Sequence, residues 1–262
     1  MCLIVFAYKY HPEYNLILAA NRDEFYARAT RPLHQWPAQP NILAGQDLEQ
    51  GGTWLGVNTD GRFSALTNHR DGSRKLSGKR SRGHLPLDFL NSTLDAEQFA
   101  KQTQNADIAY DGYNQLVGDN QNLFYLSSSR QDSQRVAPGI HGVSNARLNT
   151  PWPKLLQQKE LLRQHIDDNQ HQPEQLIRIM NNPQTYADAL LPDTGISMDW
   201  ERALSASFIQ MKQYGTRATT IIRQRYDGET EIIEQNYDAK GATEQHSYTL
   251  QLPVIGGISR ES

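Results

Sequence analysis

Two short apolar runs separated by a turn open the chain, and they constrain its fold more than any other feature. The first run, Cys2 to Tyr8 (CLIVFAY), is dense in β-branched and aromatic residues, and the second, Leu16 to Ala20 (LILAA), follows a turn at residues 11–15. Short apolar runs bounded by turn residues indicate buried strands. Because the start of one strand faces the end of the next in an antiparallel hairpin, we expect Cys2 to lie beside residues 21–23.

Later segments repeat this pattern around strong turn dipeptides such as Asp60-Gly61 and Asp227-Gly228. The expected strands cover residues 51–58, 62–68, 113–118, 123–127, 139–145, 216–226, 229–237 and 247–252. The expected helices cover residues 85–104, with Asp95 as an N-cap, 151–166 and 173–182. The proline-containing stretch 25–50 shows no periodicity and is expected to be a surface excursion. Strands at both ends with helices between them predict an α+β fold, and residues 1–262 are expected to form a single domain.

Composition excludes several classes of protein. Hydrophobic residues make up 37% of the 262 residues and the net charge is −3, which excludes a disordered chain and gives no basic field for nucleic acid. The longest apolar runs stop near eight residues, whereas a spanning helix needs roughly 20, so we expect no membrane span. No basic region precedes the first apolar run, so no signal peptide is expected and a cytoplasmic location is the default. The histidines show no metal-binding spacing, so no metal is expected.

The single cysteine, Cys2, directly follows the initiator methionine. A small residue at this position permits removal of Met1, which would place a thiol and a free α-amine on one residue. A thiol has a pKa near 8.5 and an α-amine one of about 7.7–8.0, so the amine can act as the base for its own thiol. The hairpin places Asp23 where its carboxylate would orient that amine. These features predict a cysteine N-terminal nucleophile.

Three elements together resemble the NRDE family, also called the transport and Golgi organisation 2 family. They are Cys2, Asn21-Arg22-Asp23-Glu24 and Gly51-Gly52-Thr53-Trp54-Leu55-Gly56. The resemblance covers essentially the whole chain and is strongest over residues 2–70. It implies a four-layer αββα N-terminal-nucleophile hydrolase-like sandwich, with two antiparallel sheets between helix layers, and it links animal members to haem trafficking. We expect Asn21, Arg22 and Trp54 of these motifs to bind substrate.

A more distant resemblance, to the choloylglycine hydrolase and penicillin acylase group, implies the catalytic residues. That group cleaves amides with an N-terminal Cys. Its motif positions are matched by Asp23, Asn68, Asn145 and Arg217. Side-chain N–H groups of Asn68 and Asn145 would bind the oxyanion of a tetrahedral intermediate, each donor contributing about 2.7–4 kcal/mol. A buried arginine would hold the thiolate by its charge.

Each of these residues also has a purely structural interpretation. Asn68 and Asn145 are types that favour turns, Trp54 is typical of core packing, and Arg217 shares the strand parity of solvated arginines. Asp23 could pair with a nearby arginine at the end of its strand. The joint placement of these residues favours the functional interpretation.

Three functional hypotheses therefore stand. The first is a hydrolase that acts on a small amide or acyl compound without a cofactor. The second is a carrier that binds haem or another hydrophobic ligand in the same pocket without catalysis, with Cys2, His69 or His141 as a ligand to iron. The third is a surface-interaction protein that uses the stretch 69–84, which has six Lys or Arg residues and is expected to be an exposed loop at the pocket mouth. The sequence does not indicate the oligomeric state.

Overall fold

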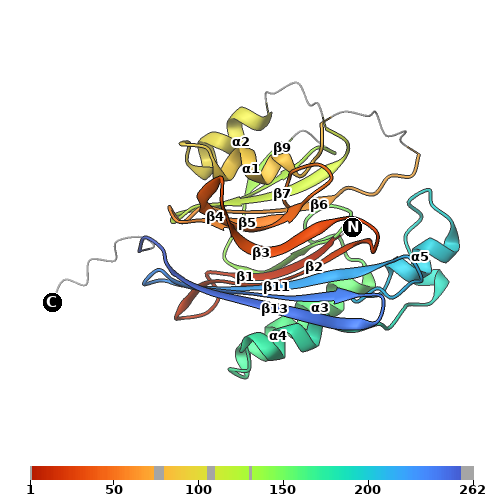
Figure 1. Ribbon diagram of the computed structural model, residues 1–262. Coiled ribbons are helices and arrows are strands. Elements are labelled where there is room, and N and C mark those ends of the chain that lie inside the picture. Colours follow the sequence, from red (N-terminus) through yellow and green to blue (C-terminus); the bar gives the residue numbers. More distant parts are fainter. Residues whose placement is uncertain (1, 74–79, 105–109, 130–131, 255–262) are drawn as a thin grey trace.

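The computed structural model describes residues 2–73, 80–104, 110–129 and 132–254. In this part of the chain, two antiparallel sheets pack face to face and helices cover both outer faces (Figure 1). The α+β arrangement predicted from the sequence pattern is confirmed, as is the four-layer sandwich that the family resemblance implies. Within the described residues, no helix has both the length and the apolar character needed to cross a membrane.

The first sheet holds the expected N-terminal hairpin at its centre. Its strand order is β10 (Gly139–Val143), β1 (Cys2–Tyr8), β2 (Tyr14–Phe25), β11 (Tyr214–Arg225), β12 (Glu229–Asp238) and β13 (Gly241–Gln251). Cys2 pairs with Arg22 and Leu3 pairs with Asn21, which confirms the predicted register of the hairpin. Helices α3 (Pro153–Asp167) and α4 (Pro173–Met180) pack against the outer face of this sheet.

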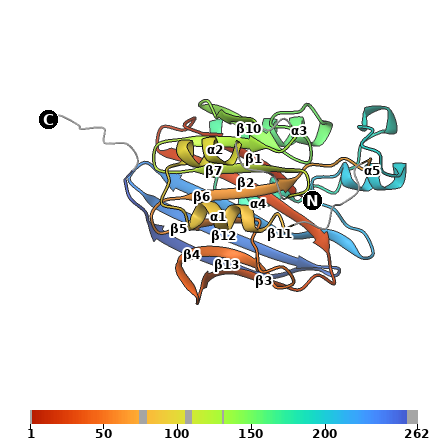
Figure 2. The same ribbon diagram turned by 90° about the horizontal axis from the view of Figure 1, so that it is seen from above.

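The second sheet is formed by the strands between residues 30 and 135. Its order is β3 (Thr30–Trp36), β4 (Gln39–Asp47), β5 (Leu55–Asn58), β6 (Phe63–Asn68), β7 (Tyr113–Gly118), β8 (Leu123–Ser127) and β9 (Asp132–Arg135). Helices α1 (His84–Leu90) and α2 (Ala96–Gln104) lie over it, as Figure 2 shows from above. The short helix η1 (Asp188–Leu190) and α5 (Met198–Leu204) follow α4, and α5 lies towards the end of the sandwich where β1 begins.

Strand β1 is buried on both faces, which explains its continuous apolar sequence. Side chains such as Ile4 and Phe6 point into the core between the two sheets. The alternate side chains Leu3 and Val5 pack against Leu155 and other residues of the covering helices. The hairpin therefore forms the floor of the intersheet core and also supports the helical layer.

Two sequence expectations for secondary structure were wrong. The stretch 25–50 is not a surface excursion, because it forms the β3–β4 hairpin. Its Pro32 lies in β3, an edge strand, where the missing backbone N–H costs no ladder bond inside the sheet. The helix expected over residues 85–104 divides into α1 and α2. Asp95 caps the second of these: its Oδ1 accepts from the Gln98 backbone N–H at 2.7 Å, as expected for an N-cap.

Candidate active site

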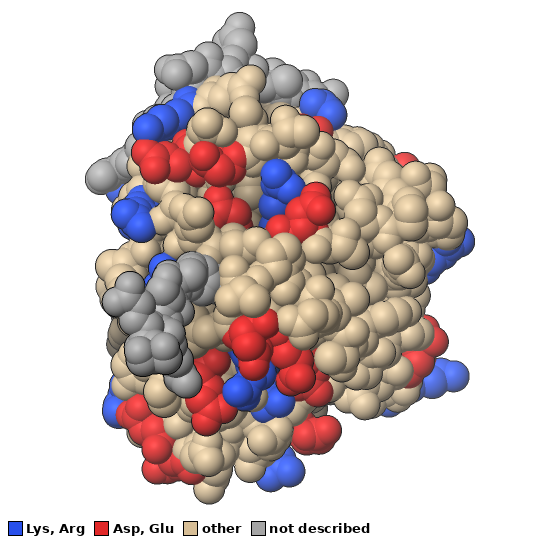
Figure 3. Space-filling model, turned by 90° about the vertical axis from the view of Figure 1, so that its left-hand side faces the viewer, with Lys and Arg blue, Asp and Glu red and all other residues tan. Residues whose placement is uncertain are grey.

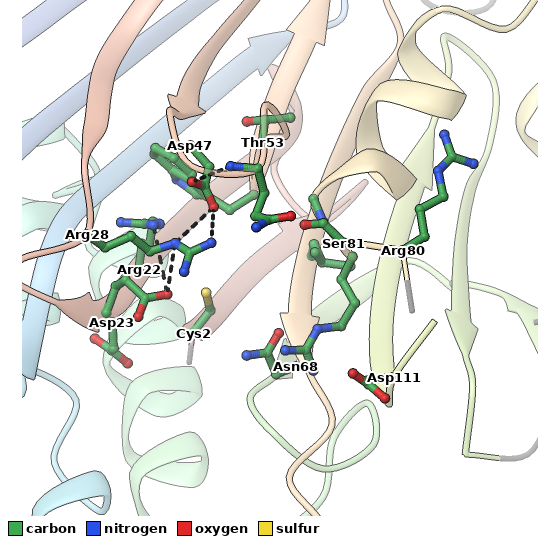
Figure 4. Close-up of a pocket in the computed structure, with 16 residues that line it drawn as sticks. Cys2, Arg22, Asp23, Arg28, Asp47, Thr53, Asn68, Arg80, Ser81 and Asp111 are labelled. Atoms are coloured by element: carbon green, nitrogen blue, oxygen red, sulfur yellow. Dashed lines mark hydrogen bonds and ion pairs between the residues drawn. The ribbon is translucent and has the colours of Figure 1, made fainter. Parts of the chain in front are cut away.

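A cavity of about 530 Å³ opens where β1 begins and β2 ends, and Cys2 is among its lining residues (Figure 4). This volume is typical of small-molecule sites. Charged side chains dominate the lining. They are Arg22, Arg28, Arg80 and Arg82, with Asp23, Glu24, Asp47 and Asp111.

The register of the hairpin fixes the position of Arg22 relative to the thiol. Because Arg22 and Cys2 are cross-strand partners, their side chains leave the sheet on the same face. The Arg22 guanidinium stacks on the Trp54 ring, 4.3 Å from its centroid, and its nearest carboxylate is that of Glu24 at 4.0 Å. Trp54 in turn lies against Gly45 of β4, where a Cβ would come within 2.3 Å of the indole. The glycine therefore allows the ring to lie against β4 and serve as the platform for Arg22.

Asp23 is the next residue along β2 and is only 2% exposed. One carboxylate oxygen accepts from the Thr216 hydroxyl at 2.7 Å, and the backbone carbonyl accepts from the Tyr214 hydroxyl at 3.0 Å. Burial raises the pKa of the Asp23 carboxyl, against the opposing effects of nearby Lys154 and Thr216. The structure thus places a fixed carboxylate in the cavity wall, beside the strand end that carries Cys2.

Cys2 is a free cysteine and is half-buried. Burial raises the pKa of this thiol, and the Asp23 carboxylate raises it further. The charged N-terminus, Arg22 and the backbone N–H of Asp23 lower this pKa without overcoming the effect of burial. A thiol in this setting needs a base close by to become a nucleophile at neutral pH.

Lys154, which sequence analysis missed, lies behind Asp23. It is in the first turn of α3, is 3% exposed, and donates from Nζ to the Leu204 carbonyl at 2.7 Å. Burial lowers the pKa of Lys154 to about 8, and the Asp23 carboxylate opposes this effect. Helical spacing could have found it, since Lys154 shares one face of the helix with buried Gln158 and Leu162.

The two candidate oxyanion donors lie at different depths. Asn68 ends β6 and lines the cavity. Asn145 follows β10, is fully buried, and donates from Nδ2 to the backbone carbonyl of Asn68 at 2.9 Å. Its neighbour Ser144 donates to the backbone carbonyl of Cys2 at 3.2 Å. Asn145 therefore lies behind the cavity wall and holds the strand end that presents Asn68.

The structure does not bring Asn21 to the cavity, which corrects its expected position. Its amide donates to the carbonyls of Met180 at 3.0 Å and Ser207 at 2.7 Å, and accepts from the Thr219 hydroxyl at 2.6 Å. The physical reason is strand alternation: Arg22 points between the sheets, so Asn21 points towards the helices. There it joins β2 to the end of α4.

Arg217 also lies outside the set of residues that line the cavity, and its expected position at the thiol is corrected too. It sits at a register shift in β11, opposite the end of β2. Its guanidinium donates to the backbone carbonyls of Phe25, Tyr26 and Arg28 at 3.0–3.2 Å. Arg217 therefore fixes the segment after β2, from which Arg28 reaches the cavity.

The basic stretch contributes to the site more directly than expected. Arg82 lines the cavity, donates to the Gly112 carbonyl at 3.1 Å, and has its pKa lowered by burial. Its loop docks closely because Thr53 donates to the Gly83 carbonyl at 2.9 Å and a Cβ on Gly52 would come within 2.5 Å of the Gly83 backbone. Neither the path of this loop nor its contact with Gly52 can be read from local sequence patterns.

The expectation of an exposed loop over residues 69–84 is wrong for Arg70 as well as Arg82. Arg70 forms a buried ion pair with Glu201 at 2.8 Å, in which the two side chains are 6% and 3% exposed. Residues 74–79 of this stretch lie outside the described part of the chain. Of the histidines considered as iron ligands, neither His69 nor His141 lines the cavity, and His141 contacts the Ala137 carbonyl at 2.8 Å.

A second hollow of about 540 Å³ lies near the turn at the start of β6, whereas Asn68 and the Cys2 cavity are at the other end of that strand. Its charged lining residues are Asp60, Arg62, Asp95, Glu97 and Asp119. Figure 3 shows carboxylates and basic side chains mixed on the face that it views, without a patch of one sign. In the described residues, no group of three or more His, Cys, Asp or Glu side chains is arranged to hold a metal.

Sequence comparison gives one family and full-length relatives. The family model described as "Transport and Golgi organisation 2" matches residues 1–239. The bovine and human homologues of transport and Golgi organization protein 2 are each 32% identical over 280 residues, covering 96% of this chain and 100% of the relative. The Drosophila melanogaster protein of the same name is 24% identical over 266 residues, covering 90% of this chain and 92% of its own length.

Structural comparison identifies the fold. A C2A mutant of conjugated bile acid hydrolase from Clostridium perfringens aligns with a TM-score of 0.52 at 9% identity, over 98% of this chain and 100% of its own. The Caenorhabditis elegans orthologue of N-acylethanolamine-hydrolyzing acid amidase aligns with a TM-score of 0.55 at 9% identity, over 84% and 92%. At this identity the likeness shows the fold alone, which is that of the N-terminal-nucleophile hydrolases.

Proposed function

The chain belongs to the Transport and Golgi organisation 2 family, and from this premise we propose that it is a cysteine N-terminal-nucleophile hydrolase acting on a small amide or related acyl compound. The observation that carries the proposal is the position of Cys2: its thiol faces a cavity of small-molecule size, beside the buried Asp23 carboxylate. Of two proteins with this fold, one is named a conjugated bile acid hydrolase and the other an N-acylethanolamine-hydrolyzing acid amidase, which adds support.

The proposed reaction begins when removal of Met1 frees the α-amine of Cys2. That amine takes the thiol proton, and the sulfur attacks the acyl carbon to form a tetrahedral intermediate. The intermediate collapses with cleavage of the C–N bond, and the leaving amine takes the proton from the α-ammonium. A water molecule then attacks the thioester with the α-amine as base, which releases the acid and restores the thiol.

The surrounding residues would support each stage of this reaction. Asp23 would orient the α-amine, because its carboxylate is already fixed by Thr216. Asn68 lines the cavity and would donate to the oxyanion, a contribution typically worth about 2.7–4 kcal/mol. The proposed reaction uses the α-amine as base, and burial raises the pKa of the Cys2 thiol while Met1 is attached.

The alternative, a carrier of haem or another hydrophobic ligand, has less support from the cavity. Trp54 and Leu66 are the large apolar side chains among its described lining residues, and half of that lining is charged. An apolar ligand is usually enclosed by mainly hydrophobic and aromatic side chains. The lining therefore suits a small polar substrate better.

The decisive experiment compares Cys2 as the first residue with Cys2 preceded by Met1. One form is made by cleaving a tag directly before Cys2, and the other retains an N-terminal extension through Met1. Each receives a pulse of iodoacetamide across a range of pH and is measured by intact mass spectrometry, which reports processing and alkylation together. Cys2→Ala is the control that should not react.

We expect the processed form to alkylate faster, with a pH dependence that the thiol and the amine set jointly. The processed wild type should also hydrolyse acyl amides, and Cys2→Ala should abolish turnover while leaving the circular dichroism spectrum unchanged. Equal alkylation rates for the two forms would show that the amine is not the base, and the carrier would then become the better explanation.

A further inference from the structure

The guanidinium of Arg22 is buried beside the thiol without a hydrogen-bonding partner from the described residues. Arg22 is 7% exposed and lines the cavity. Its contacts are the face of Trp54 at 4.3 Å and the Glu24 carboxylate at 4.0 Å, which is beyond hydrogen-bond distance. The nitrogens of this guanidinium are not among the fully enclosed polar atoms of the described residues, so they face the cavity, where an acceptor on a ligand can replace water.

We propose that Arg22, assisted by Arg82, recognises a carboxylate on the substrate, so that this protein acts on small acyl compounds bearing a carboxylate close to the scissile bond. This inference rests on the proposed hydrolase function and narrows its substrate class. A carboxylate fits because its two oxygens match the planar fork of an arginine. Stacking on Trp54 occupies the face of the guanidinium and leaves its N–H edge for an acceptor in the same plane.

The carboxylates of the cavity pair with other arginines more closely than with Arg22. Arg28 is paired with Asp47 at 2.7 Å, and exposed Arg80 is paired with Asp88 at 3.2 Å. Glu24 is shared, because it lies 3.9 Å from Arg28 and 4.0 Å from Arg22. Arg22 and Arg82 are the arginines whose charges interact with the Cys2 thiol. They are thus less closely paired with protein carboxylates than Arg28 and Arg80 are.

Asp111 is the acid that acts on Arg82, and Asp23 faces Thr216. Arg82 itself donates to one backbone carbonyl, of Gly112. Arg22 and Arg82 line the same cavity as Cys2, so an incoming carboxylate would meet two arginines there.

Geometry also limits the length of the substrate. Opposed residues of an antiparallel pair have Cβ atoms about 4.5–5.5 Å apart, so Arg22 starts within one side-chain length of Cys2. A carboxylate held by its guanidinium would lie only a few bonds from a carbonyl carbon at the sulfur. Short N-acyl amino acids and acyl amides with a terminal carboxylate fit this requirement.

Two alkylating reagents of nearly the same shape test the inference without any turnover. Iodoacetate carries a carboxylate one carbon from the reacting carbon, and iodoacetamide carries a neutral amide there. The ratio of their rates at Cys2 cancels the thiolate fraction, because both react with the same thiolate. Cys2 is the only cysteine, so the same chain unfolded in urea supplies the reference ratio.

In the folded protein we expect iodoacetate to be favoured by ~10-fold or more over the unfolded reference, the range expected for one charge-assisted hydrogen bond. Arg22→Gln should return the ratio to the reference, and Arg22→Lys should retain part of the preference because it keeps the charge without the fork. Arg163→Gln, on the exposed face of α3, is the charge-matched control and should leave the ratio unchanged.

The wild-type ratio decides the matter even if the Arg22 variants fail to fold. A ratio equal to that of the unfolded chain overturns the carboxylate inference, whatever the variants do. The proposed function is tested separately. Rapid alkylation that requires the free amine but shows no preference for iodoacetate would support the hydrolase and contradict only the inferred substrate class. A strong preference for iodoacetate combined with equal alkylation rates with and without Met1 would do the reverse: recognition of a carboxylate would stand and the amine would not be the base.

Discussion

Replacement of Lys154 by methionine should change how the stability of the protein depends on pH. In the folded state, burial lowers the pKa of Lys154 from 10.5 to about 8. Between these two values the unfolded chain binds a proton that the folded chain has released, so the free energy of unfolding rises with pH. Over about 2.5 pH units, at 1.36 kcal/mol for each, the rise totals roughly 3.4 kcal/mol. Below pH 8 the same amount counts against the fold.

Methionine has a similar length without the charge, so Lys154→Met removes this penalty. It also removes the hydrogen bond to the Leu204 carbonyl, whose loss costs about 1–3 kcal/mol at a buried site. The two effects oppose each other, and at pH 7 we expect the stabilities of variant and parent to differ by less than ~2 kcal/mol. Between pH 8 and 10.5 the parent should gain about 3 kcal/mol relative to the variant.

The assay is urea unfolding followed by tryptophan fluorescence at several pH values, with both proteins in a Cys2→Ala background. That background removes the thiol titration from the same pH range, and the tyrosines cancel in the difference between the two proteins. Lys240→Met, at an exposed position, is the control and should show no such trend. A difference between parent and Lys154→Met that stays constant from pH 7 to pH 10.5 would refute the reasoning.

Three further substitutions test separate parts of the site and its support. Asp23→Asn should slow iodoacetamide alkylation of the processed protein by ~10-fold or more, because the amine loses its orienting carboxylate; an unchanged rate would count against that role. Gly45→Ala should displace the Trp54 indole, which a Cβ would approach to 2.3 Å, and so reduce the iodoacetate preference of Cys2. Retention of the full preference would mean that Arg22 does not need its platform. Glu234 is fully buried, and burial raises its pKa, so the folded state holds its proton more tightly than the unfolded chain and stability falls as pH rises above about 4.5. Glu234→Gln should therefore raise the melting temperature more at pH 7 than at pH 5. A lower melting temperature at pH 7 would show instead that the ionised carboxylate, which accepts from the Leu33 backbone N–H at 2.8 Å, holds β3 against β12.

The sequence predicts those parts of the fold that depend on local pattern. Apolar runs around a turn placed Cys2 opposite Arg22, and amphipathic spacing predicted a helix over residues 151–166, where α3 lies. Because adjacent side chains of a strand point to opposite faces, the sequence also predicts that Asn21 and Arg22 lie on opposite faces of the sheet.

Other features could not be derived from local pattern. A register shift at Arg217 alters the direction of its side chain, and no residue type marks that shift in the sequence. Pro32 concealed strand β3 of the β3–β4 hairpin, because a proline argues against a strand in general but is tolerated in an edge strand. Arg28 and Arg82 reach the cavity from connecting segments, whose paths depend on distant contacts such as that between Gly52 and Gly83.

The strand that carries Cys2 is synthesised long before one of the strands that pair with it. Of the two strands that flank β1, β2 (Tyr14–Phe25) follows it at once, but β10 comes from residues 139–143. At about 5–20 residues per second, the nascent N-terminus waits on the order of 10 s before β10 even leaves the ribosome. An aminopeptidase that removes Met1 during that interval acts before the sheet around Cys2 is complete. The α-amine that would serve as the base for Cys2 would then be freed before the cavity itself exists.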